Sequence, residues 1–249
     1  MLRVLERRRR LAVVPAVGLA AAVLLGVAAA PASAANPTTG GSRFRLDLGS
    51  RTDFVAQTNL VQCVGASMQM MINMMRSAPD RTAATQLRYQ QLARKSSGPR
   101  IGGRERRGAS VWGWASGLTE LGAGPYRVVG ARSIDEALLI AAQAMRITRR
   151  PAGLLMWRGR HAWVMSGFHA TTDPLKPRAK VTSVIVEDPL YPRDSRTWGP
   201  SPTPGSRLTV AQLGRQFVPR RHSTRSPRLS GKYVVVLPYE LRYEHRLER

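Results

Sequence analysis

Apolar positions in the first part of the chain have the spacing of helices. Residues 63–75 are apolar on nearly every side and include a methionine cluster, which predicts a buried central helix. We interpret that cluster as core packing rather than a metal site. Residues 80–94 and 133–147 predict amphipathic helices, the second opened by a Ser133-x-x-Glu136 capping box. Residues 111–121 predict a short helix that ends at glycines.

Later in the chain the apolar segments are shorter and continuous, which predicts strands at residues 153–157, 162–168, 181–186 and 232–237. The first two strands form a hairpin over residues 158–160. Residues 189–206 read as a Pro-rich loop, followed by a short capped helix over residues 209–217. Helices that precede most of the strands predict an α+β fold, in which a helical lobe packs on an antiparallel sheet lobe.

The first 50 residues differ in composition from the rest. Residues 1–34 have a basic start, an apolar stretch and an Ala-x-Ala site, which together predict a signal peptide. An uncleaved anchor is the alternative, because the apolar stretch is long enough to span a bilayer. Residues 35–50 predict a flexible lead-in, and residues 51–249 one domain. We therefore expect a secreted protein or one at the extracytoplasmic cell surface, with membrane contact only through an uncleaved leader.

Charge adds an expectation about partners. The formal net charge is +24, and only four of the 39 basic residues are lysine. Such a surface attracts anionic partners, so an anionic cell-surface polymer is a candidate. The Gly- and Arg-rich segment 98–108 is either a solvated loop or part of such a surface. We do not expect nucleic-acid binding, because the leader indicates export and basic residues do not alternate with aromatic ones.

Candidate chemistry begins at Cys63, the single cysteine of the chain, which cannot close an internal disulfide. It stands where the apolar helix begins, and a helix N-terminus favours a thiolate. His161 opens one predicted strand and Asp188 ends the next. If these strands are antiparallel neighbours, the imidazole and the carboxylate meet. Gln57, six residues before the cysteine, offers a side-chain amide to an oxyanion.

A thiol, an imidazole that moves its proton and a carboxylate that orients the imidazole are the groups that nucleophilic acyl transfer requires. Each residue also has a structural interpretation: a buried cysteine, a strand histidine, a turn aspartate before Pro189. Gln62 is an alternative oxyanion donor and His169 an alternative base. No zinc-ligand spacing is present, and we expect neither a metal nor a cofactor.

These motifs resemble those of papain-like cysteine peptidases. The resemblance rests on Gln57-x5-Cys63-x-Gly-Ala-Ser, on His161-Ala-Trp-Val and on an Asp188-Pro pair that ends a strand. Within that superfamily the chain is most similar to the bacteriocin-processing (double-glycine leader) peptidases, here in a stand-alone form. The resemblance implies a nucleophile at Cys63, a general base and acid at His161, an orienting residue at Asp188 and an oxyanion donor at Gln57. The papain-type Cys-Gly-Ser-Cys-Trp signature is absent.

The sequence therefore predicts an exported cysteine peptidase that hydrolyses peptide or protein substrates through a thioacyl-enzyme. A peptidoglycan-directed amidase is an alternative, because it would share the thioester intermediate. An inactive protein of this fold that binds anionic cell-wall polymers is another.

Overall fold

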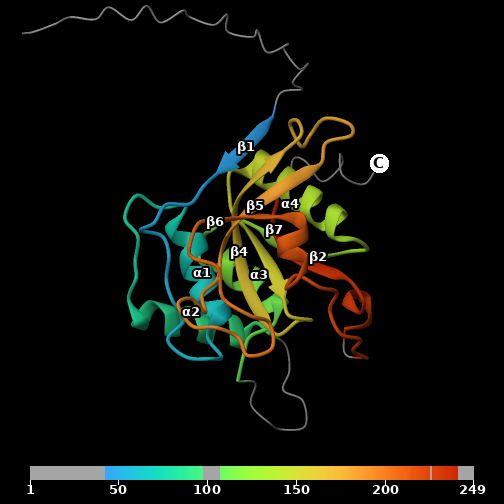
Figure 1. Cartoon of the computed structure of the whole chain (residues 1–249). Helices are drawn as coiled ribbons and strands as arrows, with labels where there is room; N and C mark the ends of the chain where they lie inside the picture. Colours follow the sequence, from blue (N-terminus) through green and yellow to red (C-terminus); the bar gives the residue numbers. More distant parts are fainter. Residues whose placement is uncertain (1–42, 98–106, 225, 241–249) are drawn as a thin grey trace, which may run out of the picture. The chain divides into compact units, whose positions relative to one another are not determined.

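The computed structural model describes residues 43–97, 107–224 and 226–240. Within these ranges seven strands form an antiparallel sheet in the order β2-β7-β3-β4-β5-β6, and β1 also pairs with β4 (Figure 1). The strands are β1 (Phe44–Asp47), β2 (Tyr126–Ala131), β3 (Ala152–Met156), β4 (His161–Ala170), β5 (Val181–Glu187), β6 (Ser206–Thr209) and β7 (Tyr233–Pro238). The helices are α1 (Cys63–Asn73), α2 (Ala83–Lys95), α3 (Val111–Glu120), α4 (Ile134–Thr148) and α5 (Val210–Gly214), with a 3-10 turn at Pro227–Leu229.

Side chains on the two faces of the sheet enter separate cores. On β4, Ala162 and Val164 pack in the core that α1 and α3 share, whereas Trp163 and Met165 pack in the core under α4. Consecutive residues of a strand point to opposite faces, so a strand covered on both faces is a continuous apolar run. The sheet therefore lies between α1 and α3 on one face and α4 on the other, while α2 packs outside α1 and α3.

The α+β class is confirmed, and so are the four longer predicted helices, whose ends differ by a few residues. Side chains of Thr82, Ser110 and Ser133 cap α2, α3 and α4. The capping box of α4 is altered, because the Glu136 carboxylate accepts the backbone N–H of Arg132 rather than that of Ser133 (N···O 2.7 Å). Helices α1, α2 and α3 make up the helical region that carries Cys63, while α4 and Leu213 of α5 pack in the core on the opposite face of the sheet.

Two strands were not predicted, and a third corrects a prediction. The flexible lead-in of residues 35–50 is wrong for Phe44–Asp47, which forms β1 against the end of β4. Tertiary pairing orders this segment although its neighbours in sequence are Gly-rich. Strand β6 likewise begins inside the predicted Pro-rich loop and pairs with β5, and β2 pairs with β7. The predicted hairpin is confirmed, since Met156 lies opposite His161.

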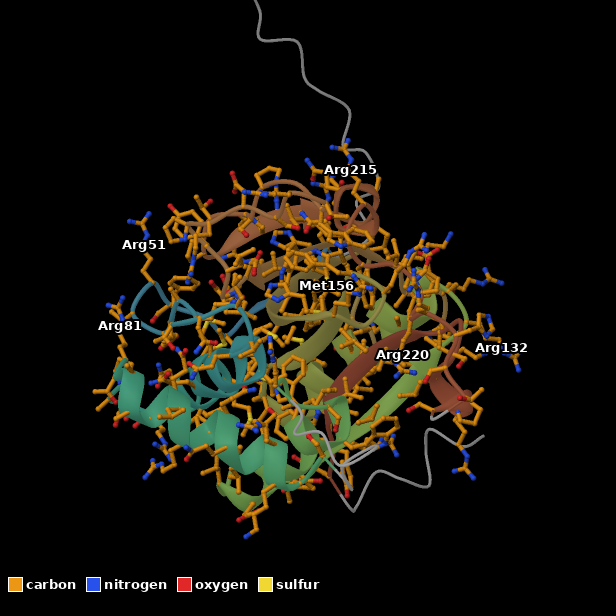
Figure 2. All side chains as sticks on the ribbon, turned by 90° about the horizontal axis from the view of Figure 1, so that it is seen from below. Arg51, Arg81, Arg132, Met156, Arg215 and Arg220 are labelled. Atoms are coloured by element: carbon orange, nitrogen blue, oxygen red, sulfur yellow. The ribbon has the colours of Figure 1, made fainter. Side chains whose placement is uncertain are left out.

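The predicted signal peptide, residues 35–42 of the lead-in and most of the loop 98–108 lie outside the described residues. Of the helices in the described ranges, none is both long and apolar enough to cross a bilayer. Figure 2 shows Arg51, Arg81, Arg132 and Arg215 extending outward from the ribbon, with Met156 in the interior. The basic side chains thus give the outside of the molecule its positive charge.

Candidate active site

Cys63 is the first residue of α1, and its side chain is half-buried. In the described part of the chain, no acceptor takes the backbone N–H of Cys63, whereas that of Ala66 already donates to the Gln62 carbonyl (3.0 Å). A helix N-terminus carries partial positive charge from such unpaired N–H groups. Cys63 therefore lies where a backbone N–H at the helix start is available as a donor to an oxyanion.

Two glutamines of α2 hold this helix start in place. The Gln90 side chain accepts the Gly65 N–H (2.8 Å) and donates to the Val61 carbonyl (2.9 Å). Gln86 accepts the N–H of Thr58 (2.8 Å). Both glutamines are buried, although on an amphipathic helix they are easily taken for solvent-facing residues. Nothing in the local pattern marked them as part of the site.

Close packing of α1 against α2 explains why the motif has a glycine, Gly65, two residues after the cysteine. A Cβ atom at this position would lie 2.7 Å from the Gln86 carbonyl oxygen and 2.8 Å from Cβ of Gln90. Helices α1 and α2 approach so closely there that no larger residue fits without displacement.

His161 and Asp188 come together where β4 begins and β5 ends, as antiparallel pairing of these two strands predicts. The Nε2 atom of His161 lies 2.7 Å from Oδ1 of Asp188. The two side chains are 4% and 0% exposed. Oδ1 also accepts the N–H of Leu190 (2.8 Å), which fixes the carboxylate. Oδ2 is buried and has no hydrogen-bond partner among the described residues.

The electrostatic environment of His161 favours the imidazolium. Burial by itself lowers the pKa of His161, but the hydrogen bonds to Asp188 and Cys63 and the negative charges of both partners raise it from 6.5 to about 9. Because Nε2 is bonded to Asp188, Nδ1 is the ring nitrogen that remains for the thiol. The imidazole thus joins Cys63 to Asp188, in the order that acyl transfer requires.

Gln57 reaches the same region through its backbone. Its backbone N–H donates to the carbonyl of Pro189 (2.7 Å), the residue that follows Asp188. Its buried amide donates from Nε2 to the Asn59 carbonyl (2.9 Å), and Oε1 has no partner among the described residues. Nε2 carries a second N–H beyond the one given to Asn59. Its role as an oxyanion donor stays a prediction.

The two alternative residues differ in position. Gln62 is buried beside Cys63, and its Oε1 accepts the Thr58 hydroxyl. His169 lies on the same strand as His161 but eight residues farther along, a separation of about 27 Å in an extended strand. Because His169 lies this far from the start of β4, it cannot act as the base for Cys63.

Aromatic packing adds a residue that the sequence reasoning missed. The Trp157 indole stacks on the His161 ring, with 4.0 Å between centroids and 20° between planes. Its Nε1 donates to Oε1 of Gln216 (2.8 Å), which fixes the indole. Trp198 lies parallel to Trp157 at 6.4 Å. A tryptophan at the turn just before a candidate catalytic histidine was the signal available.

Glu187 precedes Asp188 but belongs to a different environment. It accepts the N–H of Gly205 (3.0 Å) and the Ser166 hydroxyl (3.4 Å). Burial raises the pKa of Glu187 to about 7, and the charges of Asp47 and Asp53 also raise it. Since neighbours along a strand point to opposite faces, this carboxyl group is not a second partner for His161.

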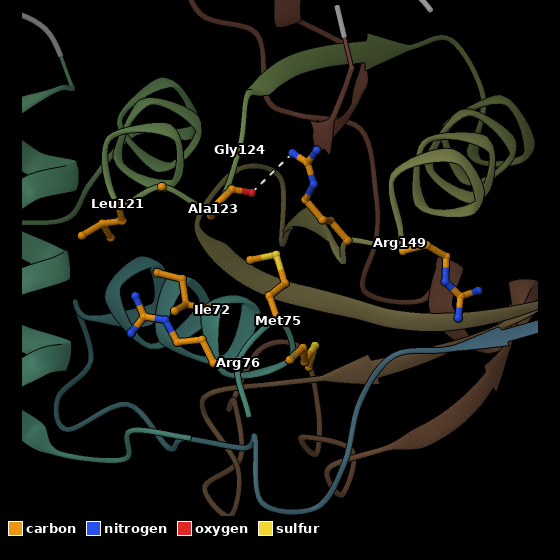
Figure 3. Close-up of a pocket in the computed structure, with 10 residues that line it drawn as sticks. Ile72, Met75, Arg76, Leu121, Ala123, Gly124 and Arg149 are labelled. Atoms are coloured by element: carbon orange, nitrogen blue, oxygen red, sulfur yellow. Dashed lines mark hydrogen bonds between the residues drawn. The ribbon is translucent and has the colours of Figure 1, made fainter. Parts of the chain in front are cut away.

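A hollow of about 610 Å³ lies elsewhere, where α1 ends (Figure 3). Ile72, Met75 and Arg76 line it, and Arg150 donates there to the Ala123 carbonyl (3.4 Å). Helix α1 has 11 residues, which corresponds to about 16 Å. This hollow is therefore at the far end of α1 from Cys63 and is not part of the candidate active site.

Comparison with known proteins gives a distant likeness. No family model and no curated protein matches the chain. Among solved structures, UfSP from C. elegans is similar, with a TM-score of 0.40 and 15% sequence identity. The likeness covers 72% of this chain and 30% of that chain. The chain thus spans less than a third of that relative, and the case for a function rests on the geometry of the site.

Proposed function

We propose that the protein is a cysteine peptidase that hydrolyses peptide bonds through a thioacyl-enzyme formed on Cys63. The observation that carries the proposal is the buried 2.7 Å contact between His161 and Asp188. Cys63 is close enough to this imidazole to contribute to its raised pKa. A histidine between a thiol and a carboxylate has little structural purpose, because burying charged groups is costly. It has a clear catalytic one.

In the proposed reaction the Cys63 thiolate attacks the substrate carbonyl carbon, and the carbonyl oxygen becomes an oxyanion. The free Cys63 N–H and Nε2 of Gln57 are the proposed donors to that oxygen. The His161 imidazolium then gives its proton to the leaving nitrogen as the C–N bond breaks. Water attacks the resulting thioester while His161 takes a proton from it, and the acid product leaves. Asp188 keeps the imidazole oriented throughout.

The bacteriocin-processing branch and an amidase that acts on peptidoglycan are finer versions of this proposal, and both use the same thioester. We also propose export to the cell surface or medium. The N-terminal sequence of the secreted protein would test it: a start after Ala34 supports cleavage, whereas retention of residues 1–34 supports an anchor.

One alternative function has an observation in its favour. The chain carries a net charge of +24, so an inactive protein of this fold could bind anionic wall polymers. Polymer binding would weaken steeply as ionic strength rises, because salt screens exposed charges. Reaction of the thiol with a neutral reagent would change little.

Iodoacetamide alkylation of Cys63 at pH 6.5 tests the proposal. A free thiol of pKa about 8.5 is only about 1% ionised at this pH. We expect the wild type to react about tenfold faster than His161→Ala, because the imidazolium stabilises the thiolate. His169→Ala is the matched control, since it removes a histidine from the same strand far from Cys63, and it should react like the wild type. Equal rates in wild type and His161→Ala would make Cys63 a structural residue.

Hydrolysis is tested next with a mixed peptide library and mass spectrometry. We expect cleavage by the wild type and none by Cys63→Ala. Reactive Cys63 without cleavage of any peptide would favour another acyl substrate over a peptide.

A further inference from the structure

A hollow of about 300 Å³ lies directly beside the candidate active site. We call it the arginine pocket; its lining residues are Trp157, Arg158, Arg160, Thr197, Trp198 and Arg221. Two indoles and three guanidinium-bearing side chains thus surround one small space. None of these side chains had a role in the reaction derived above, apart from the contact of Trp157 with His161.

The backbone holds the arginine pocket in a defined shape. Trp157, Arg158 and Gly159 all have positive φ, at 55°, 57° and 98°. Left-handed conformations in two non-glycine residues are costly and persist only where the surroundings impose them. Here the Trp157 N–H donates to the Gln216 carbonyl (3.1 Å), and the Arg221 N–H donates to the Arg158 carbonyl (3.2 Å). These bonds bring Arg158 and Arg221, 63 positions apart in sequence, to the same place.

The charge in the arginine pocket has no counterpart within the described residues. Arg158, Arg160 and Arg221 form no ion pair with a carboxylate in that part of the chain, and all three are exposed. Three like charges at one hollow repel one another, and an anion that enters relieves this repulsion. A guanidinium has the planar donor geometry that matches a carboxylate. The two indoles supply apolar surface for the carbon atoms that carry it.

The position of the arginine pocket relates it to the reaction. Its wall Trp157 stacks on the ring of His161 at 4.0 Å, so one indole separates the pocket from the proposed general acid. A substrate group in the pocket would therefore be close to the bond that is cleaved. Thr197 and Trp198, which also line the pocket, come from the segment between Asp188 and β6.

We propose that the arginine pocket is a specificity subsite that binds a carboxylate of the substrate close to the scissile bond. The carboxylate is either the side chain of an acidic residue or the free C-terminus of a peptide. This inference rests on the proposed function, because the subsite matters only if Cys63 reacts.

Three iodoacetyl reagents test the subsite without knowledge of the natural substrate. N-iodoacetyl-glutamine amide is neutral, N-iodoacetyl-glutamate amide adds a side-chain carboxylate, and N-iodoacetyl-glutamine adds a terminal one. The rate of Cys63 alkylation is measured with each at pH 6.5. We expect one acidic reagent to react about tenfold faster than the neutral one, the contribution of one charge-assisted hydrogen bond. Which acid is preferred identifies the source of the carboxylate.

Two variants with the same change in charge separate the arginine pocket from the general positive field. The first replaces Arg158, Arg160 and Arg221 by glutamine. The second replaces Arg51, Arg81 and Arg132, three exposed arginines outside the arginine pocket, which Figure 2 shows on the surface. We expect the preference for the acidic reagent to disappear in the first variant and to persist in the second.

The outcomes separate this inference from the proposed function. Equal loss of preference in both triple variants, or equal rates with all three reagents in a wild type whose reactivity depends on His161, would overturn the subsite. Loss of the His161 dependence itself would overturn the proposed function instead. Alkylation of the first triple variant by the neutral reagent at the wild-type rate would show that its active site remains assembled.

Discussion

Replacement of Asp188 by asparagine is the perturbation that most directly probes the buried pair. The amide oxygen can still accept the hydrogen bonds from His161 and Leu190, so the geometry is kept while the charge is removed. The pKa of His161 stands at about 9 instead of 6.5, which corresponds to about 3 kcal/mol at 1.36 kcal/mol per pH unit. We expect the variant to lose much of this stabilisation of the imidazolium.

The sign of the pH dependence follows from the raised pKa. The folded protein keeps a proton on His161 that the unfolded chain releases between pH 6.5 and 9. The stabilisation is therefore complete below pH 6.5 and is lost as the pH rises through 9. In Asp188→Asn, the free energy of unfolding should fall by about 1–3 kcal/mol at pH 6 and by less above pH 9. Urea denaturation at the two pH values measures this difference.

NMR titration of the histidine ring signals measures the pKa of His161 directly. The chain has four histidines, so their ring resonances can be assigned one by one. We expect the His161 midpoint near pH 9 in the wild type and closer to 6.5 in Asp188→Asn, with the His169 signal unchanged by the substitution. The same titration in a Cys63→Ser background isolates the contribution of the carboxylate, because Cys63 also raises the pKa of His161.

A wild-type midpoint near 6.5 would refute this reasoning. So would a midpoint that Asp188→Asn leaves in place, because the buried carboxylate would then not stabilise the imidazolium. Either result would also remove the main support for the proposed peptidase.

Three further predictions concern the surroundings of the site. The pKa of Glu187 is raised from 4.5 to about 7, so the folded protein keeps a proton that the unfolded chain releases in this range. The free energy of unfolding should therefore fall as the pH rises from 4.5 to 7, by about 3 kcal/mol at most. In urea denaturation, Glu187→Gln should flatten this decline. Gly65→Ala should lower stability by about 1–3 kcal/mol through overpacking, whereas Gly214→Ala, whose Cβ would meet only one side-chain carbon at 3.6 Å, should change the melting temperature little. Gln90→Ala should cost about 1–3 kcal/mol, because it leaves the buried N–H of Gly65 without its acceptor, and it should slow alkylation of Cys63. Gln91→Ala, at an exposed neighbouring position, is the control. Equal effects of both substitutions would contradict the role of Gln90 in holding the start of α1.

Local sequence patterns were sufficient to place the candidate residues Cys63, His161 and Asp188. The apolar runs at residues 162–168 and 181–186 predict two strands, and if these are antiparallel neighbours the start of one lies beside the end of the other. The pairing of β4 with β5 fulfils this condition. The meeting of His161 and Asp188 follows from that pairing. The position of Cys63 at a helix start follows from the apolar pattern that begins there.

Other parts of the site depend on contacts between distant segments, and periodicity carries no record of them. Gln90 bonds to Gly65 across 25 positions, yet on its own helix it reads as a surface residue. Strands β1 and β6 have four residues each, too few for a clear alternation, and they are ordered by their partners β4 and β5. The arginine pocket joins a hairpin turn to two loops that lie about 40 and 60 positions farther along. Hydrophobic periodicity thus determined the longer helices, four of the strands and the order of the candidate groups. Side-chain hydrogen bonds and strand pairing, which act between distant positions, decided what surrounds them.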